Sequence, residues 1–405
     1  MIQVAVMGYG TIGSGVAEVL DINREGICRV VGEEISVKYI LDLREFPGDR
    51  NETKIVHDLS VITEDPEVRI VVETMGGVNP AYEFTRKCLE SGKSVVTSNK
   101  AVVAAKGTEL LQIARDRNLN YLMEASVGGG IPLIRPLTQS LAGETIQEIS
   151  GILNGTTNYI LTKMSREGES FEKALRNAQE LGYAERNPEA DVEGHDTCRK
   201  IAILTALATG KETNFELVHT EGITAITEKD FRYAKKLGMQ IKLIGASRIG
   251  AEKVSIFVVP MMLEDGNPLY AISDVYNGVM VTGKTLGRVM FYGSGAGKLP
   301  TANAVVSDIV EIANGNLARN IPFGWGAEKQ SLLPFEDEKF RYFVRFTGSY
   351  DEKIGAIRAA LGTVQVVTLP EFDGEEFAVL TEKLEESKIA RTLAGFEGVL
   401  QVIRA

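Results

Sequence analysis

The chain has 405 residues, a formal net charge of −11, 44% hydrophobic residues and 24% charged residues, which is the composition of a globular protein. This length predicts two or three domains. The acidic balance and the lack of a basic block disfavour a surface for nucleic acid, and no apolar run reaches the roughly 18 residues of a membrane helix. The three cysteines form no CxxC pair, and the three histidines are too scattered for a zinc site. The N-terminal residues predict a strand instead of a signal peptide. We therefore expect a cytoplasmic protein.

The first predicted unit is a strand that runs through a glycine-rich junction into a helix. The strand is IQVAVMGYG, and TIGSGVAEVLDI repeats apolar residues at helical spacing. Gly8, Gly10 and Gly13 at the junction form the GxGxxG pattern, which allows a tight turn, a close approach of the pyrophosphate and close packing of helix on strand. Thr11 and Ile12 stand between these glycines, where the first helix amides face the phosphates. This position predicts a dinucleotide-binding site.

The second predicted strand bears on the choice of cofactor. ISVKYILDL ends at Asp42, and Arg44 follows two residues later. An acid at this place holds the ribose hydroxyls of NAD, whereas an arginine accommodates the extra phosphate of NADP. Because residues 23–34 predict an inserted loop, the spacing from the glycines is longer than usual. Arg44 favours NADP(H) over NAD(H), the alternative being a solvated surface arginine.

Strands and helices continue to alternate up to about residue 130. The predicted strands are VRIVVETMGG, SVVTSNK and YLMEASVGGGIP, and the helices between them are PAYEFTRKCLESGK and GTELLQIARDRN. This alternation predicts right-handed crossovers and a doubly wound parallel sheet. Thr74, Met75 and Lys100 then lie at the carboxyl edge, where ligands bind in such sheets. Because a lysine at a helix N-terminus is electrostatically unfavourable, we expect Lys100 to have a function, although it could be an ordinary residue at a helix start.

A single carboxylate, Glu124, precedes the glycines at 128–130. A carboxylate beside exposed main-chain carbonyls suits a hard cation. The residues alone favour the other interpretation, in which this stretch is a hinge into a second domain.

The segment LGYAERNPEADVEGHDTCRK, from Leu181 to Lys200, is polar and acidic and leads into the apolar helix IAILTALATG. Such a helix is expected to be buried. Asp196 and Lys200 are four residues apart and share one helical face. An acid and an amine beside an acidic loop could bind a small zwitterion and move protons, the alternative being a charged surface linker.

The stretch GVMVTGKT at 278–285 matches the phosphate-binding pattern of an NTPase letter by letter. That pattern requires a strand, a glycine-rich loop and a helix in succession. Here the loop positions are Val-Met-Val, and LGRVMFYG after them is strand-like. The residues predict a hairpin that turns near Gly283 and disfavour an NTPase.

Around these stretches, residues 131–300 predict an α+β domain, with a helix from Phe171 that Ser170 caps and Gly182 follows. The tail from about residue 338 to 405 predicts the order βαββαβ of a ferredoxin-like unit. Such a unit could bind a regulatory metabolite, pair subunits or simply close the chain. A helix at about 300–320 is expected to return and complete the first domain, residues 1–130.

Several of these stretches together resemble homoserine dehydrogenase. They are GYGTIG, SNKA at 98–101, NGTTNYI at 154–160, the acidic segment and GSGAGKLPTANAVVSD near Gly293, and they follow the family's order over residues 1 to about 325. The resemblance implies NAD(P)-dependent interconversion of L-homoserine and L-aspartate 4-semialdehyde, in threonine, methionine and isoleucine biosynthesis. It also implies a monofunctional form with an ACT-like tail, assembled as a homodimer or homotetramer.

By the same resemblance, Lys200 is the catalytic proton donor and Lys100 stands near the nicotinamide and the reacting oxygen. Glu185 holds the substrate's amino group, and Asp191 and Asp196 order the site.

The resemblance also assigns residues to the cofactor and to a cation. Thr74, Met75 and Gly297 match positions around the cofactor. Glu124, with the carbonyls of Val127, Gly129 and Ile131, matches a structural site for Na⁺ or K⁺.

The chain departs from the family pattern in a few places. Thr197 and Cys198 stand where smaller residues are common, and His195 is unexpected. The tail lacks the Pro-Gly turn typical of ACT domains and has residues 351–354 (DEKI) there, which puts feedback through that turn in doubt. A dehydrogenase for another small amino acid or aldehyde, or a non-catalytic metabolite sensor, remains an alternative.

Overall fold

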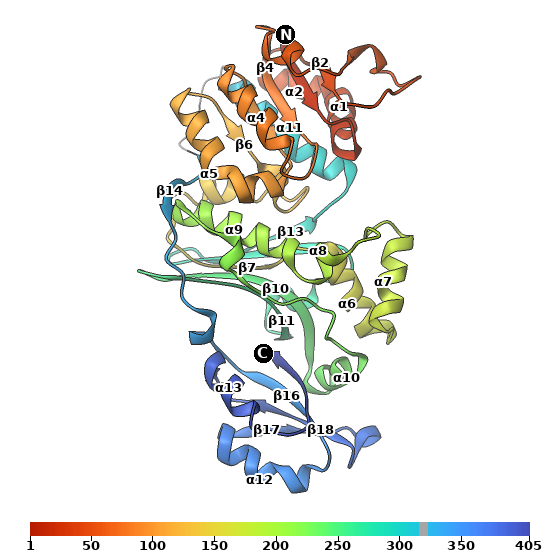
Figure 1. The fold of residues 1–405 in the computed structure, drawn as a ribbon, viewed down its shortest axis with the longest axis vertical. Helices are drawn as coiled ribbons and strands as arrows, with labels where there is room; N and C mark the ends of the chain where they lie inside the picture. The colour runs from red at the N-terminus through yellow and green to blue at the C-terminus, as the bar shows by residue number, and fades with distance from the viewer. Residues whose placement is uncertain (316–322) are drawn as a thin grey trace. The chain divides into compact units, whose positions relative to one another are not determined.

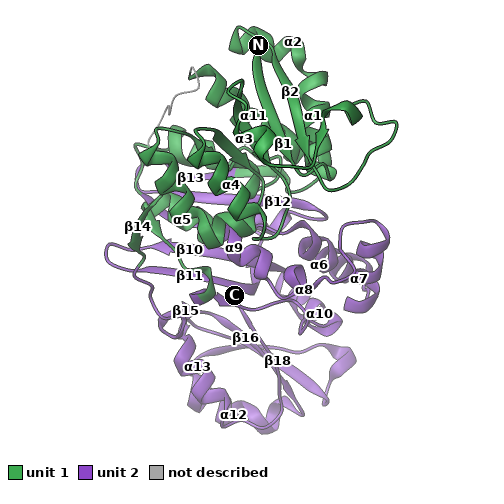
Figure 2. Ribbon diagram, turned by 45° about the horizontal axis from the view of Figure 1, so that its top comes forward, with its two compact units in different colours: residues 1–145, 202–216, 291–330 green, residues 146–201, 217–290, 331–405 purple. Residues whose placement is uncertain are grey.

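The structure, a computed structural model, describes residues 1–315 and 323–405. In this described part the chain forms two compact units, coloured separately in Figure 2. Unit 1 comprises Met1–Thr145, Ala202–Glu216 and Phe291–Gln330, and unit 2 comprises Ile146–Ile201, Leu217–Met290 and Ser331–Ala405. The chain therefore passes between the units several times.

Unit 1 contains a parallel sheet of six described strands in the order β3-β2-β1-β4-β5-β6. This is the strand order of dinucleotide-binding domains, and the predicted parallel sheet is confirmed. The strands are rich in β-branched residues and buried on both faces, as parallel sheets require. They are β1 (Ile2–Met7), β2 (Ile35–Leu41), β3 (Ile55–Val56), β4 (Val68–Glu73), β5 (Ser94–Thr97) and β6 (Tyr121–Leu122).

Helices cover both faces of this sheet. Its helices are α1 (Thr11–Ile22), α2 (Arg24–Val31), α3 (Ser60–Thr63), α4 (Ala81–Glu90), α5 (Lys100–Asp116) and α11 (Lys298–Asn314). On one face α11 lies beside α1, although almost 300 residues separate them (Figure 1), and both contribute to one apolar core. On the other face Cys88 of α4 contacts Met7 of β1. Helix α11 is the predicted returning helix; residues 316–320 of that prediction lie outside the described residues.

Unit 2 is built on one mixed sheet of ten described strands in the order β13-β12-β7-β10-β11-β20-β16-β18-β17, with β9 paired to β11. The division between the units falls within β13, whose residues 291–294 are assigned to unit 1. Strands β10 and β11 form a long antiparallel hairpin at its centre. The strands are β7 (Ile146–Ile152), β9 (His219–Thr220), β10 (Met239–Ile249), β11 (Val254–Glu264), β12 (Tyr276–Gly283), β13 (Gly287–Ser294), β16 (Tyr342–Thr347), β17 (Val364–Val367), β18 (Glu376–Thr381) and β20 (Val399–Arg404).

Besides short 3-10 and π-helical segments, the remaining elements of the described residues are seven α-helices and two short strand pairs. Ser170 caps α7 through its side chain, as predicted. The helices are α6 (Gly155–Glu167), α7 (Phe171–Glu180), α8 (Glu189–Val192), α9 (His195–Thr209), α10 (Glu228–Leu237), α12 (Tyr350–Leu361) and α13 (Glu386–Leu393). The pairs are β8 (Lys211–Glu212) with β14 (Gly326–Lys329), and β15 (Lys339–Phe340) with β19 (Leu384–Glu385).

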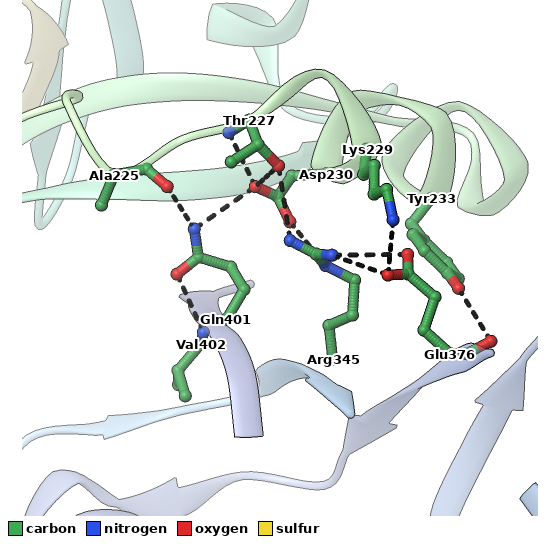
Figure 3. A network of polar contacts seen from close by, with 9 residues as sticks. All are labelled: Ala225, Thr227, Lys229, Asp230, Tyr233, Arg345, Glu376, Gln401 and Val402. Carbon is green, nitrogen blue, oxygen red and sulfur yellow. Dashed lines mark hydrogen bonds and ion pairs between the residues drawn. The ribbon is translucent and has the colours of Figure 1, made fainter. Parts of the chain in front are cut away.

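Apart from the two-residue strand β19, which pairs with β15, the tail has the element order β16-α12-β17-β18-α13-β20, which is the predicted βαββαβ order. It lies in the same unit as the preceding sheet because β20 pairs with β16 on one side and with β11 on the other. A buried ion-pair network adds to this join (Figure 3): the Arg345 guanidinium lies 3.1 Å from Asp230 of α10 and 3.1 Å from Glu376 of β18.

The observed division differs from the three predicted segments in two ways. The tail shares a unit with the central sheet, for the reason just given. Residues 131–145 belong to unit 1, because Arg135 pairs with Asp308 and Glu311 of α11. The three-domain description stays a prediction.

Two local predictions can be compared with the structure directly. The predicted loop at 23–34 was wrong, because residues 24–31 form the exposed helix α2, which Gly32 ends in the left-handed conformation. The predicted hairpin is confirmed: β12 and β13 flank a turn at 284–286, where a phosphate-binding loop would need a helix. None of the helices in residues 1–315 and 323–405 has the length and apolar character needed to cross a membrane.

Candidate active site

The glycine-rich junction of unit 1 is shaped by contacts that tolerate no side chain. A Cβ on Gly13 would lie 1.9 Å from the Gly8 carbonyl oxygen, and Gly8 itself has a φ of 90°. The Thr74 hydroxyl donates to that same carbonyl at 2.8 Å and so ties the end of β4 to the loop. Gly10 is the N-cap of α1. Because glycine has no side chain that could cap the helix, the first main-chain amides of α1 remain available to an anion. The geometry fits the predicted dinucleotide site.

Asp42 and Arg44 form one ion pair just after β2. Arg44 donates to both carboxylate oxygens of Asp42, through Nε at 3.0 Å and through a terminal nitrogen at 2.9 Å. Asp42 also accepts the amide of Tyr9 at 2.7 Å, inside the glycine junction. The Arg44 side chain holds the pKa of Asp42 well below its usual range. The two residues that the sequence predicts to bear on the choice between NAD and NADP therefore occupy a single cluster.

A buried carboxylate that sequence reasoning missed, Glu73, organises the neighbouring strand ends. It accepts hydrogen bonds from the Thr97 hydroxyl at 2.6 Å, the Met75 amide at 2.8 Å and the Asn99 side chain at 3.3 Å. Burial raises its pKa. Asn99 is the N-cap of α5, and its side-chain oxygen accepts the next helical amides. Glu73 thereby connects the loop of Thr74 and Met75 with the helix that starts at Lys100.

Gly297 and the Glu124 turn also lie in unit 1. Gly297 is the N-cap of α11 with a φ of 119°, a conformation that favours glycine.

The Glu124 carboxylate accepts the amides of Leu133 at 2.6 Å, Ile134 at 2.8 Å and Arg135 at 2.7 Å, and so fixes the start of the following segment. Val127, Gly129 and Ile131 are buried in the same turn. Within the described residues, no group of three or more His, Cys, Asp or Glu side chains could hold a metal.

In unit 2, the predicted acid and amine of the long helix meet. The Lys200 ammonium lies 2.7 Å from Asp196 Oδ2, one turn earlier in α9, and it donates to the Leu153 carbonyl at 2.7 Å. Lys200 is 7% exposed and Asp196 is 2% exposed. A charged pair held this far from water has a restricted orientation and can stabilise charge that develops beside it.

The structure adds Asn154 to this pair. Its side-chain nitrogen donates to Asp191 at 2.7 Å and to Asp196 at 2.9 Å. The predicted residues Asp191, Asp196 and Lys200 are therefore brought into one cluster. Glu185 lies in the exposed loop between α7 and α8, and in the described contacts only its main-chain oxygen is held, by Gln179 at 3.0 Å. A substrate would have to reach the Glu185 carboxylate from the surface of unit 2.

Comparisons with known proteins agree with these features. The family model for the homoserine dehydrogenase NAD-binding domain matches residues 8–124, and that for homoserine dehydrogenase matches residues 132–310. A homoserine dehydrogenase of Synechocystis is 44% identical over 319 residues, covering 77% of this chain and 73% of that protein.

Solved structures show the same likeness. A homoserine dehydrogenase from Thiobacillus denitrificans superposes with a TM-score of 0.92 at 32% identity and covers all of this chain and 97% of that one. A mutant of a hyperthermophilic archaeal homoserine dehydrogenase in complex with NADPH has a TM-score of 0.65 at 28% identity over 76% of this chain and 97% of that chain. The glycine junction, the acid–amine helix and these matches together show that the chain belongs to the homoserine dehydrogenase family.

Proposed function

We propose that Lys200 is the proton donor in the reaction of this family, the reversible NAD(P)-dependent hydride transfer between L-homoserine and L-aspartate 4-semialdehyde. Hydride that reaches the aldehyde carbon leaves negative charge on its oxygen, and a positioned acid must neutralise that charge. The observation that carries the proposal is the buried Lys200–Asp196 pair, with Nζ 2.7 Å from the carboxylate. In the oxidative direction the same amine would take the hydroxyl proton of homoserine.

The acidic residues of unit 2 would bind the other charged part of the substrate. We assign Asp191 and Glu185 to the ammonium group of homoserine, because carboxylates are its natural partners. Asp196 would hold Lys200 in place. Lys100, at the start of α5, would act from the cofactor side, near the nicotinamide and the reacting oxygen.

The cofactor is a nicotinamide dinucleotide, and we propose that the protein prefers NADP(H) over NAD(H). It would be held by Gly8, Gly10, Thr11, Ile12, Gly13, Arg44, Thr74, Met75, Lys100 and Gly297. A bound NADPH would supply the hydride in the reductive direction, and NADP⁺ would accept it in the oxidative direction. The extra phosphate of either form would compete with Asp42 for the Arg44 guanidinium, which is 60% exposed and accessible. The archaeal relative in complex with NADPH supports this choice.

The Glu124 turn is proposed to hold a structural Na⁺ or K⁺. One carboxylate oxygen accepts two amides and the other accepts one, so the second oxygen keeps a lone pair for a cation. The remaining ligands would be the main-chain carbonyls of Val127, Gly129 and Ile131. A single carboxylate with neutral carbonyls suits a monovalent ion better than a divalent one.

The βαββαβ tail would be an ACT-like regulatory domain.

The chain would form a homodimer or homotetramer through the sheet of unit 2. A groove of about 390 Å³ on that unit, which Met261, Arg248 and Arg288 help to line, offers apolar and charged surface to a second copy. Light scattering should give twice or four times the 44.1 kDa of one chain; a monomer at micromolar concentration would reject the assembly.

A substrate panel tests the proposed function. Purified protein should reduce NADP⁺ or NAD⁺ with L-homoserine much faster than with other hydroxy amino acids. A comparable rate with another amino acid or aldehyde would move the protein to a different substrate, and no turnover with any of them would favour a metabolite sensor.

A further inference from the structure

We propose that Asn154 is a positioning residue that holds both Asp191 and Asp196, and through Asp196 the proton donor Lys200. This inference deepens the proposed function and rests on it. Nothing in the spacing of the sequence points to this role, because Asn154 is 37 residues from the nearer acid. The contacts in the folded chain point to it.

The first step is that both hydrogens of the Asn154 amide are directed at carboxylates. Its Nδ2 atom lies 2.7 Å from Asp191 Oδ1 and 2.9 Å from Asp196 Oδ2. An asparagine amide has two N–H donors, so these contacts use both of them. Asn154 is 5% exposed, and water therefore competes little for the same donors.

The second step is that the other end of the side chain is fixed as well. Asn154 is the N-cap of α6, and its Oδ1 atom accepts the Thr157 amide at 2.8 Å. The cap thus determines which end of the amide faces the acids. Helix α6 orients the donor end of Asn154 toward Asp191 and Asp196.

The third step is electrostatic. Asp191 and Asp196 both lie within hydrogen-bond distance of one nitrogen atom, so their negative charges repel each other at short range. Two N–H donors between them offset that repulsion without adding a charge. Lys200 belongs to the same cluster, since Asp196 Oδ2 accepts from both Asn154 and Lys200.

The fourth step links the main chain to the amine. The Leu153 carbonyl, one residue before Asn154, accepts a hydrogen bond from Lys200 at 2.7 Å. Two successive residues between β7 and α6 therefore hold both partners of the Lys200–Asp196 pair. Asn154 does not titrate, so its contribution is to orientation and to local charge balance.

The decisive variant is Asn154→Asp. Aspartate keeps the oxygen that caps α6 and caps a helix about as well as asparagine. It removes both donors and places a third carboxylate beside two others. We expect kcat for homoserine oxidation to fall about 10²-fold at about pH 8, on the scale of a misplaced acid–base group, while the Kd of NADP(H) stays unchanged.

The pH profile separates positioning from mere capping. When the introduced carboxyl group is protonated, it regains one O–H donor, so the ratio of variant to wild-type kcat should rise as the pH falls from about 8 to about 6. Asn154→Ser, which also caps but brings no charge, should lose kcat by a smaller factor with a ratio that does not depend on pH, and it serves if the aspartate variant does not fold.

Asn177→Asp is the matched control, because Asn177 donates to the carboxylate of Glu169 at 2.9 Å elsewhere in unit 2. It should keep the wild-type kcat. Normal kcat in Asn154→Asp or in Asn154→Ser would overturn the positioning role while wild-type turnover of homoserine continues. A wild-type protein that does not turn over homoserine would instead refute the proposed function, and this inference with it.

Discussion

Lys200 and Asp196 lie 2.7 Å apart on successive turns of α9, and both side chains are almost completely buried. The spacing of four residues places them on one helical face, and Leu153 and Asn154 supply further hydrogen bonds to the pair. A buried ion pair is costly to desolvate unless such additional bonds satisfy it. The contacts therefore hold the cluster in one arrangement, as the proposed stabilisation of charge by Lys200 requires.

The Asp42–Arg44 pair leads to a prediction about cofactor choice. Arg44→Ala should weaken NADP(H) binding about tenfold to a hundredfold, because the loss of a charge-assisted hydrogen bond costs roughly 1.5–3 kcal/mol. NAD(H) binding should change by less than about threefold, since Asp42 would still be able to accept the ribose hydroxyls. Fluorescence titration of both reduced cofactors measures the two Kd values.

A suitable control for this measurement is Arg24→Ala, because Arg24 is similarly exposed and also paired with acids in unit 1. It should leave both Kd values unchanged. Equal weakening of NADPH and NADH by Arg44→Ala would show that Arg44 does not recognise the phosphate.

The Arg345 network, which contains none of the predicted catalytic residues, predicts a large effect on stability. Arg345→Met leaves two buried carboxylates, Asp230 and Glu376, without their shared guanidinium (Figure 3). Removing one partner of a buried charge cluster typically costs about 3–5 kcal/mol. The free energy of unfolding, from urea titration followed by circular dichroism, should fall by that order.

Arg232→Met provides the matched comparison in the same helix α10. Arg232 is 55% exposed and lies 3.9 Å from Glu371, so its loss should cost less than about 1 kcal/mol. Similar destabilisation by the two substitutions would argue against a special role of the buried network.

Lys242 predicts a pH dependence of stability. It is buried in β10, and burial lowers its pKa from 10.5 to about 8. Between pH 8 and 10.5 the unfolded chain binds a proton at this lysine that the folded chain has lost. The contribution of Lys242 to the free energy of unfolding should therefore increase with pH in that window, by up to about 1.4 kcal/mol per pH unit. The same contribution should be lost as the pH falls from about 10.5 through about 8.

Comparing the wild type with Lys242→Met isolates the pH dependence that comes from Lys242, because the other groups that titrate at alkaline pH are present in both proteins. The difference in unfolding free energy, wild type minus variant, should grow from about pH 8 to about pH 10. A difference that is flat across this range would show that Lys242 is not desolvated in the folded protein.

The local parts of the fold could be predicted from the sequence. Gly8, Gly10 and Gly13 indicated the strand–turn–helix junction, since a side chain at Gly13 cannot fit. The spacing of Asp196 and Lys200 placed them on one face because helical geometry alone decides it. The missed helix α2 has no buried residues, so its weak apolar pattern resembled a loop, although Gly32 marked its end.

The parts that could not be predicted depend on long-range contacts. Asn154 reaches Asp191 and Asp196 only after β7, α6 and α9 have packed together, and Arg345 meets Asp230 across 115 residues of chain. In the sequence, Glu73 is only the last residue of a strand. Its role in connecting neighbouring strand ends is visible only in the structure, where it accepts hydrogen bonds from Thr97 and Asn99. Periodicity carries no information about such pairs.

The most direct test of the account is kcat for aspartate semialdehyde reduction by Lys200→Ala, measured with saturating NADPH and with its Kd determined in parallel. We predict a loss of about 10²-fold or more, an unchanged Kd for NADPH, and partial recovery of kcat when a small amine such as ethylamine is added. A variant with nearly normal kcat would contradict the assignment of Lys200 as proton donor.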